Sequence, residues 1–403
     1  MARRALAGAS RSTPLFVVIN NIPTPYRVHL FETLHSELAN RGCRFEAWFM
    51  ASTESGRLWT MDPNGWSFPS RTYGGLHVGL RLHGRRVPMH LNPGIVKDVV
   101  MRRPSWVLLG GSWLMPTVVS SAIAQRTLPG GADVLLWSEA NAPYSIHQTG
   151  VVATARRLLY EGADACVVPG QVAEETIRIA WGISPRRVLM LPNIVDERVY
   201  RDHVRDARSH RPAIRANLGL EPTDVALLVP AKLHEATKGV LNFLRALSPL
   251  GRDDMKVLVA GEGPDRAATE GWLSEGGLSG VTLLGHCDQE AMINVLAACD
   301  CMVLPSFHDP NPLAVVEALW ARLPLIVSRA CGNWPEAVRE GENGWLVDPS
   351  DHDTIRRAVL ALLALSPEER GAMGRASLAL AEGAFASEAA VRRFIDDLSV
   401  AYP

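Results

Sequence analysis

Apolar runs of four to six residues recur along the chain, and amphipathic segments separate them. Continuous apolar runs are typical of strands buried on both faces, as in parallel sheets, whereas the segments between them carry helical spacing. Strands that alternate with helices in this way indicate an α/β protein. The runs are 15–19, 44–49, 106–109, 134–137, 165–168 and 188–191 in the first half, and 225–229, 256–260, 281–284, 301–304, 324–328 and 344–347 in the second half.

The runs form two sets, and 403 residues are too many for one ordinary hydrophobic core. The sequence therefore predicts two doubly wound, Rossmann-like domains with a boundary inside 192–196. We expect domains at 1–195 and 196–380, and a C-terminal helix at 381–403 that packs back on the first domain. Such folds bind ligands at the carboxyl ends of their strands, so we expect the two parallel sheets to face a central cleft that holds the ligand.

Composition narrows the class of protein. An apolar fraction of 47% and a charged fraction of 21% are those of a soluble globular protein. The six cysteines lack the paired spacing of metal sites, which favours a reduced, cytoplasmic setting with Cys299 and Cys301 in a core. The uncharged run 106–125 contains Pro116 and a Gly-Gly pair, so we expect a strand, a loop and a helix rather than a membrane span. The apolar part of 1–13 is too short for a signal peptide.

Lysine is scarce in this chain and concentrated in one loop. There are 37 arginines but four lysines, and two of the four, Lys232 and Lys238, lie in the stretch PAKLHEATKGV. The stretch follows a predicted strand and opens a predicted helix, and both features favour an anion. It therefore predicts a phosphate site, with two solvated surface lysines as the alternative.

A pair of acids follows a later strand. Asp309 lies in the loop after 301–304, and Glu317 lies eight residues further on, in the helix predicted after Pro312. Carboxylates accept several strong hydrogen bonds and can hold sugar hydroxyls. The spacing is weak evidence by itself, because Asp309 can also serve as a helix cap and Glu317 as an exposed helix residue.

One Asp-x-Asp sequence, Asp351-His352-Asp353, has the form of a metal-binding motif. It opens a predicted helix, which favours an N-cap role for Asp351. No other group of His, Asp and Glu residues has metal-ligand spacing in the sequence. We therefore expect neither a metal ion nor a resident cofactor.

In their order along the chain, these motifs resemble the family 4 retaining glycosyltransferases of the GT-B fold, over most of 188–400. LPNIVD resembles the family's entry to the donor domain, and AKL…TKG resembles its basic pair, with Lys232 where arginine is usual. VLVAGEGPDR and VTLLGHCDQE resemble the next two loops. PSFHDPNPLAVVEAL resembles the Glu-x7-Glu motif, with Asp309 in place of the first glutamate, and RACGNWPEAVREGENGWLV resembles the element that follows.

The resemblance implies that Lys232 and Lys238 hold the diphosphate of a nucleotide-sugar donor, a co-substrate rather than a cofactor. It implies that Glu317 binds the ribose hydroxyls and that Asp309 positions the donor sugar. Either Asn311 compensates for the shorter Asp309, or the donor differs from the usual ones. Transfer without a metal ion is also implied. Further donor contacts are implied for Pro312, Leu313, Gly261, Gly263 and His286.

The first half is less diagnostic. After its first strand comes NNIPTPYR, where many relatives have a glycine-rich loop. Arg27 in this stretch either reaches a phosphate or simply begins a helix, and Tyr26 beside it is a candidate acceptor contact. Glu139, at another strand end, is a candidate to orient the acceptor hydroxyl or to act as a base. A structural turn carboxylate is the alternative.

Charge is unevenly divided, although the net charge is −1. Residues 1–195 carry 20 basic and 12 acidic residues, whereas 196–403 carry 21 and 30. Segment 63–97 has five basic residues, no acid and interleaved aromatics. This pattern predicts reversible contact with an anionic membrane, at its inner face, with a mobile basic loop as the alternative. Nucleic acid is not expected, because no recognised binding module is present.

Together these features predict a hexosyltransferase-like enzyme of polysaccharide biosynthesis. It would move a sugar from a nucleotide diphosphate-sugar to a cell-surface glycan or a lipid-linked glycan precursor. Two alternatives stay open. One is a nucleotide-sugar epimerase or hydrolase on the same fold, and the other is a glycan-binding or scaffold subunit without catalysis.

Overall fold

The computed structural model describes residues 13–54, 61–82, 85–141 and 149–399. Within it the chain forms two compact units. Unit 1 consists of Met1–Pro169, Ala173–Asn193 and Ser387–Pro403, and unit 2 consists of Gly170–Val172 and Ile194–Ala386. The chain therefore crosses from unit 1 to unit 2 after Asn193 and returns before Ser387. None of the described helices is long and apolar enough to cross a membrane.

Unit 1 is built on a seven-stranded parallel sheet in the order β3-β2-β1-β6-β7-β8-β9. A separate antiparallel pair, β4 and β5, joins it. Three of its helices, α1, α2 and α3, have proline at their first turn, where the missing N–H costs nothing. The strands are β1 (Leu15–Asn20), β2 (Arg44–Phe49), β3 (Ser70–Thr72), β4 (Leu76–Leu82), β5 (Arg85–Leu91), β6 (Trp106–Leu109), β7 (Asp133–Trp137), β8 (Ala165–Val168) and β9 (Val188–Met190). The helices are α1 (Pro25–Ala39), η1 (Pro63–Gly65), α2 (Pro93–Arg102), α3 (Pro116–Thr127), α4 (Gly150–Gly162), α5 (Gln171–Glu175), which unit 2 shares, η3 (Thr176–Ala180) and α16 (Ser387–Ser399).

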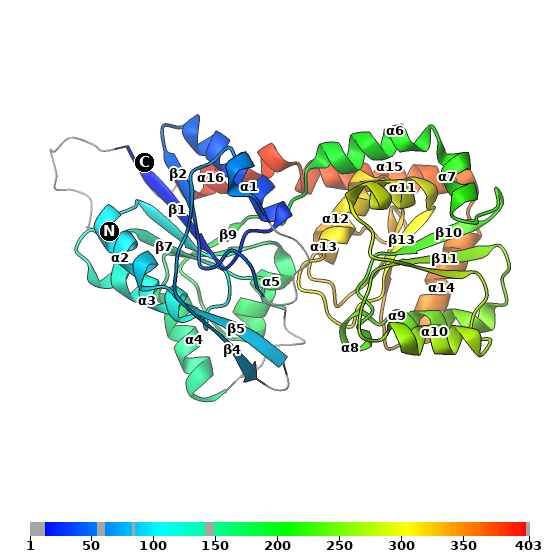
Figure 1. The fold of residues 1–403 in the computed structure, drawn as a ribbon, viewed down its shortest axis with the longest axis horizontal. Helices are drawn as coiled ribbons and strands as arrows, with labels where there is room; N and C mark the ends of the chain where they lie inside the picture. The colour runs from blue at the N-terminus through cyan, green and yellow to red at the C-terminus, as the bar shows by residue number, and fades with distance from the viewer. Residues whose placement is uncertain (1–12, 55–60, 83–84, 142–148, 400–403) are drawn as a thin grey trace. The chain divides into compact units, whose positions relative to one another are not determined.

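Unit 2 is built on a six-stranded parallel sheet in the order β12-β11-β10-β13-β14-β15. Figure 1 shows α6, α7, α11 and α15 on one side of this sheet and α9 and α10 on the other. The strands are β10 (Val225–Val229), β11 (Met255–Ala260), β12 (Val281–Gly285), β13 (Cys301–Leu304), β14 (Leu325–Ser328) and β15 (Gly344–Val347). The helices are η4 (Arg198–His203), α6 (Val204–Arg208), α7 (Arg211–Asn217), α8 (Glu235–Lys238), α9 (Val240–Leu247), η5 (Ser248–Leu250), α10 (Arg266–Ser274), α11 (Gln289–Ala298), α12 (Leu313–Trp320), α13 (Trp334–Ala337), α14 (His352–Leu363) and α15 (Pro367–Ala384).

Every apolar run that predicts a strand is a strand in the structure, with ends shifted by at most one residue. The reason is physical: strands buried on both faces by helices must be apolar at every position. Cys299 and Cys301 are buried, as predicted. The alternative of a mobile loop for 63–97 is wrong, because this segment contains β3, the β4–β5 pair and the start of α2.

The last helix, α16, lies in unit 1 and begins later than the expected 381. It packs on α1, and Phe394 of α16 meets Phe16 of β1 edge to face, with ring centroids 6.4 Å apart. Arg392 donates to both carboxylate oxygens of the buried Glu37 at 3.1 Å. These contacts attach the C-terminal segment to the start of the chain.

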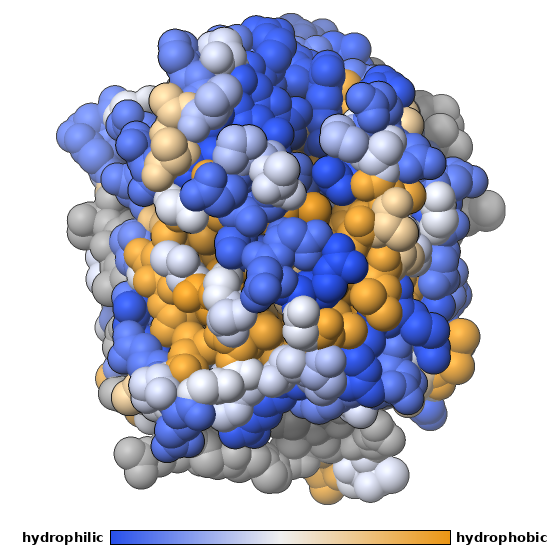
Figure 2. Space-filling model, turned by 90° about the vertical axis from the view of Figure 1, so that its right-hand side faces the viewer, coloured by the Kyte–Doolittle hydropathy of each residue, from blue (hydrophilic) through white to orange (hydrophobic). Residues whose placement is uncertain are grey.

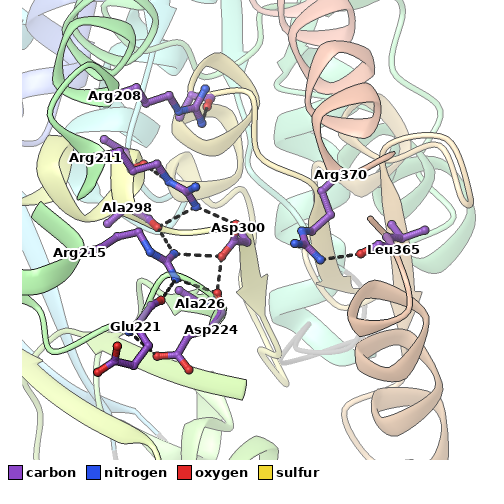
Figure 3. A network of polar contacts seen from close by, with 12 residues as sticks. Arg208, Arg211, Arg215, Glu221, Asp224, Ala226, Ala298, Asp300, Leu365 and Arg370 are labelled. Carbon is purple, nitrogen blue, oxygen red and sulfur yellow. Dashed lines mark hydrogen bonds and ion pairs between the residues drawn. The ribbon is translucent and has the colours of Figure 1, made fainter. Parts of the chain in front are cut away.

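A buried ion cluster ties α7 to the amino ends of two central strands of unit 2 (Figure 3). Asp300, just before β13, accepts hydrogen bonds from Arg211 at 2.7 Å, from Arg215 at 3.3 Å and from the backbone N–H of Ala226 at 2.9 Å. Arg215 also donates to the carbonyl of Asp224 at 2.7 Å. The cluster lies at the sheet end opposite to the carboxyl ends, so we assign it to stability.

Unit 2 has fewer large apolar side chains with high exposure than unit 1 among the described residues. Figure 2, a view onto the side where α7 and β11 lie in Figure 1, shows apolar patches that hydrophilic residues interrupt. Among the described residues of unit 2, Leu360 is the one large apolar side chain with high exposure, whereas unit 1 has nine.

Candidate functional site

Each unit has one place where its strand order reverses. In unit 2 the reversal lies between β10 and β13, and in unit 1 it lies between β1 and β6. Loops that leave neighbouring strands at such a point diverge to opposite faces of the sheet, and a crevice opens between them. Several site residues suggested by the sequence lie in loops near these two points, whereas His286 lies at the edge strand β12.

The two lysines follow β10, at the reversal in unit 2. Lys232 is exposed between the buried Ala231 and Leu233, and Lys238 ends the short helix α8. Gly239 follows with φ of +61°, and a Cβ there would lie 2.8 Å from the carbonyl oxygen of Pro305. Glycine is therefore required for the loop after β10 to pass so close to the loop after β13.

Gly261 and Gly263 shape the lysine loop from the neighbouring strand. Both lie in the loop after β11, and a Cβ would come within 2.1 Å of the carbonyl of Ala231 or 2.0 Å of that of Leu233. The two loops are joined by a hydrogen bond from the Leu233 N–H to the Glu262 carbonyl at 3.1 Å. The glycines therefore let two backbones pack directly, and this fixes where Lys232 emerges.

Asp309 and Lys238 form an ion pair across the reversal point, with both side chains largely buried. The N–H of His308 donates to the carbonyl of Thr237 at 2.9 Å, so the two loops are also held by backbone. The structure thus brings together a base and an acid that lie 71 residues apart in the sequence. In this state each neutralises the other.

The segment from Asn311 to Leu313 leads from that loop into α12. Pro312 is the N-cap of α12, one position before the first turn, and Leu313 begins the helix. Asn333 donates to the Pro312 carbonyl at 2.9 Å and so fixes the segment. The side-chain oxygen of Asn311 is buried without a hydrogen-bond partner among the described residues. It is an acceptor that a hydroxyl group can satisfy.

Glu317 lies on α12, one turn into the helix, and is only partly exposed. Burial raises the pKa of its carboxyl to about 7, and a hydrogen bond from Tyr200 opposes this shift. Tyr200 comes from η4, where α12 and η4 pack together. The sequence did not single out Tyr200, because 117 residues separate it from its partner.

His286 lies apart from this group. It is exposed at the carboxyl end of β12, the edge strand, and β11 separates β12 from β10. Gly285 before it has φ of +76°, a left-handed conformation suited to glycine.

Unit 1 contains a second polar group, around Arg27. Arg27 is buried in the first turn of α1 and donates to Glu139 at 2.6 Å and to the Asn193 side chain at 3.1 Å. Asn193 donates to the same Oε1 atom of Glu139 at 2.9 Å. The guanidinium lies over the Trp137 ring, 3.7 Å from its centroid. Among the described residues, the other carboxylate oxygen of Glu139 has no hydrogen bond, and 35% of the side chain is exposed.

A cavity of about 220 Å³ opens beside this group, wholly within unit 1. It combines polar side chains with two aromatic rings, a mixture suited to a hydroxyl-rich ligand. The hydroxyl of Thr24 is buried without a hydrogen-bond partner among the described residues. The lining residues are Asn20, Asn21, Ile22, Thr24, Tyr26, Arg27, Gly111, Trp137 and Glu139.

The Asp-x-Asp sequence forms the N-terminal cap of helix α14. Asp351 is the N-cap and accepts from the N–H of Asp353 at 2.8 Å and of Thr354 at 3.4 Å. Asp353 pairs with Arg356, and His352 contacts the Asn242 side chain at 2.9 Å. The structural role predicted for Asp351 is confirmed.

Part of the chain matches a known protein family. Residues 210–378 match the sequence profile of the glycosyl transferases group 1. The match covers about two fifths of the chain, within unit 2, and this part of the chain is similar to the group 1 glycosyltransferases. The matched part contains the lysine loop, the Lys238–Asp309 pair and Glu317. The family resemblance predicted from the sequence is therefore confirmed.

Individual glycosyltransferases are also similar to this chain in sequence. The D-inositol 3-phosphate glycosyltransferase of Mycobacterium sp. (strain KMS) is 29% identical over 221 residues, 53% of this chain and 48% of that protein. The chain thus spans about half the length of the curated relatives it matches.

Solved structures are also similar to this chain. Anabaena HepE in complex with UDP and glucose has a TM-score of 0.72 and 15% sequence identity, and the alignment covers 96% of this chain and 100% of the HepE chain. The lipopolysaccharide outer core galactosyltransferase WaaB has a TM-score of 0.69 and 13% identity, with 96% and 99% covered. These likenesses confirm the predicted GT-B fold class.

Proposed function

We propose that this group 1 glycosyltransferase moves a sugar, with retention, from a nucleotide diphosphate-sugar to a hydroxyl group of a glycan or of a lipid-linked glycan precursor. The observation that carries the proposal is the group of Lys238, Asp309 and Glu317 at the strand reversal of unit 2. Lys238 would supply a cation for a diphosphate, and Asp309 and Glu317 would supply carboxylates for sugar hydroxyls. All three lie near the crevice where such sheets bind ligands. HepE was solved with UDP and glucose, which agrees with a nucleotide-sugar donor.

In the proposed reaction, the bond between the anomeric carbon and the diphosphate oxygen breaks, and its electron pair leaves on the diphosphate. Lys232 and Lys238 neutralise that charge, assisted by the N-terminus of α12 at Pro312 and Leu313. Asp309 and Asn311 hold the sugar hydroxyls, and Glu317 holds the ribose. We place the loops of Gly261, Gly263 and His286 nearer the nucleoside.

The acceptor is proposed to bind in unit 1. Its hydroxyl oxygen forms the new bond to the anomeric carbon, and its proton passes to a base, for which the unpaired oxygen of Glu139 is the candidate. The cavity supports a carbohydrate acceptor, because Tyr26 and Trp137 offer ring faces and Asn20, Asn21 and Thr24 offer hydrogen bonds. The name of WaaB, a lipopolysaccharide core galactosyltransferase, agrees with a glycan acceptor. In this proposal 1–195 is the acceptor domain and 196–380 the donor domain.

A donor screen tests the proposal. The protein is incubated with a panel of UDP-sugars and GDP-sugars, with and without a membrane extract, and both free nucleotide and sugar transfer are measured. We expect one donor to release nucleotide only when the extract is present, together with a glycosylated product. Free sugar without an acceptor would indicate a hydrolase, and an altered sugar would indicate an epimerase. Nucleotide binding without turnover of any donor would indicate the non-catalytic subunit.

A further inference from the structure

The loop after β14 runs beside the loop that carries Asp309. Strands β13 and β14 are parallel neighbours in the sheet of unit 2, so their loops leave the sheet at the same end. Asp309 and Cys331 form an isolated parallel bridge. In it the N–H of Asp309 donates to the carbonyl of Ala330 at 3.3 Å, and the N–H of Gly332 donates to the carbonyl of Asp309 at 2.9 Å. The backbone at Asp309 is therefore held from the β14 side, independently of its side chain.

Asn333 extends this contact to the start of α12. Its side chain is buried, and the amide donates to the carbonyl of Pro312 at 2.9 Å. The same carbonyl accepts from the N–H of Val315 at 3.3 Å, within the first turn of α12. Asn333 therefore fixes the N-terminus of α12 from outside the helix. Asn311 lies between the two attached points, Asp309 and Pro312.

Capping of a helix does not explain Asn333. It occupies the N-cap position of α13, where asparagine commonly accepts a hydrogen bond from the helix backbone, but its side chain makes no such bond. Its side-chain oxygen is instead buried without a hydrogen-bond partner among the described residues. A buried acceptor without a partner lowers stability. Natural proteins retain such local costs mainly at functional sites, which points to a role beyond the stability of α13.

We propose that Asn333 is a positioning residue for sugar transfer and that it acts through segment 309–312. In this proposal its side chain touches neither the nucleotide nor the sugar. By holding Pro312, it directs the N-terminus of α12 at the departing diphosphate and keeps Asn311 beside the sugar. The proposal rests on the proposed function, which places the donor at this point of unit 2.

The nucleoside end of the donor should not depend on Asn333. Glu317, the proposed ribose contact, lies one turn into α12 and receives a hydrogen bond from Tyr200. Tyr200 belongs to η4, which packs on α12. Glu317 therefore has an attachment of its own. Loss of the Asn333 amide should separate two properties, because sugar transfer should fall while affinity for the nucleotide persists.

Two substitutions remove the hydrogen bond to Pro312. Asn333→Ala removes the amide without adding charge, and Asn333→Asp keeps the shape but replaces the donating nitrogen with an oxygen. The matched control is Asn343→Ala. Asn343 is also buried in unit 2 and donates to a backbone carbonyl, that of Ala337, at 3.0 Å. It lies just before β15, at the end of the parallel sheet opposite to 309–312.

Hydrogen–deuterium exchange measures the positioning in the full chain without any donor. In peptides that contain 309–315, we expect both Asn333 variants to exchange about tenfold faster than the wild type, because the segment opens more often. Asn343→Ala should leave the exchange of these peptides unchanged. Circular dichroism verifies that each variant is folded. Wild-type exchange of these peptides in both folded Asn333 variants would overturn the proposal.

Kinetics and titration test whether the positioning matters for transfer. With the donor that the screen identifies, we expect kcat of both Asn333 variants to fall about 10–100-fold, because a misplacement of about 1 Å is sufficient for such a loss. Affinity for UDP and GDP in isothermal titration should stay within about threefold of the wild type, since the Glu317 attachment is intact. Asn343→Ala should lower thermal stability and keep kcat.

Two kinetic results speak against the proposal. A normal kcat in the Asn333 variants would show that the contact is structural only, and a nucleotide affinity that falls as far as kcat would show that the whole site has been lost. Either result leaves the transferase proposal standing. If no donor is turned over in the screen, the transferase proposal fails, whereas the exchange measurement still decides whether Asn333 holds the segment.

Discussion

Lys238 and Asp309 neutralise each other in the structure, so a diphosphate at this point has to compete with a carboxylate for the ammonium group. An ammonium is a compact charge with three donors, which can serve both an acid and a phosphate without a fixed plane. Asp309 can therefore keep the Lys238 ammonium in place without fixing the orientation of its N–H groups. Lys232, exposed and on the same loop, is the second cation of the proposed donor site.

Lys238→Ala is expected to reduce transfer by about 10²–10³-fold, because one group that stabilises developing charge is removed. Lys238→Arg should recover part of the activity, since the charge returns in a larger, planar group. Lys97→Ala, at an exposed lysine of α2, is the matched control and should be neutral. The measurement is the steady-state transfer rate of folded protein. Normal turnover of Lys238→Ala would remove this lysine from the donor site.

Glu317 predicts a pH-dependent affinity for a nucleoside diphosphate. Burial raises the pKa of its carboxyl to about 7 from an ordinary 4.5, so protonation begins as pH falls toward neutral. The carboxylate accepts ribose hydroxyls better than the neutral acid does, so affinity should rise with pH through about 7 and then level off. Tyr200→Phe removes a hydrogen bond that lowers this pKa, and should move the midpoint upward.

Isothermal titration of the nucleotide across pH measures this effect. Glu317→Gln cannot titrate, and it separates the carboxyl from the ionisation of the phosphate itself. We expect the glutamine variant to bind more weakly and to lose the dependence near pH 7. A wild type and a Glu317→Gln variant with parallel pH profiles would show that this carboxyl does not meet the nucleotide.

At the level of elements, the ion cluster around Asp300 connects α7 to β10 and β13, the strands that flank the reversal point of unit 2. Helix α7 otherwise has only a short apolar face against α11. Removal of one partner from such a cluster leaves an arginine buried without its counter-ion, which is the costly case for buried ion pairs.

Asp300→Ala is expected to lower the free energy of unfolding by about 3–5 kcal/mol. The control is Asp254→Ala, which breaks the exposed pair with Arg252 and should cost less than about 1 kcal/mol. Denaturant unfolding of both variants gives the comparison. Equal, small losses would mean that the Asp300 cluster is as weak as a surface pair.

At the level of the whole molecule, we expect transfer to proceed in EDTA. The proposed donor site supplies positive charge from Lys232, Lys238 and the N-terminus of α12. Asp351 and Asp353, the acids with metal-like spacing, are engaged in the capping of α14 and in a pair with Arg356. The transfer rate is measured before and after chelation, and again after manganese or magnesium is added. An activity that EDTA abolishes and only a metal restores would contradict the proposed charge balance.

Local pattern was sufficient for much of this protein. The strand cores are evident in the sequence because burial on both faces requires apolar side chains at every position. The lysine loop stands out because lysine is rare in the chain, and the order of the motifs indicates the family. The sequence did not predict the β4–β5 pair, although LHVGLRL alternates with period two, because the basic residues of 63–97 favoured a loop or a membrane contact.

The partners inside each site were decided only by the tertiary structure. Lys238 with Asp309, Arg27 with Glu139 and Tyr200 with Glu317 are each separated by 71 residues or more. Each pair meets because strand order and loop geometry bring distant chain segments together, and no local periodicity records which segments these are. Apolar periodicity determines which residues are buried, whereas packing determines which polar groups face each other. The sequence therefore determined the elements and the resemblance to a family. The fold decided which acidic side chains are paired, as Asp309 is with Lys238, and which carboxyl has a raised pKa, as Glu317 has.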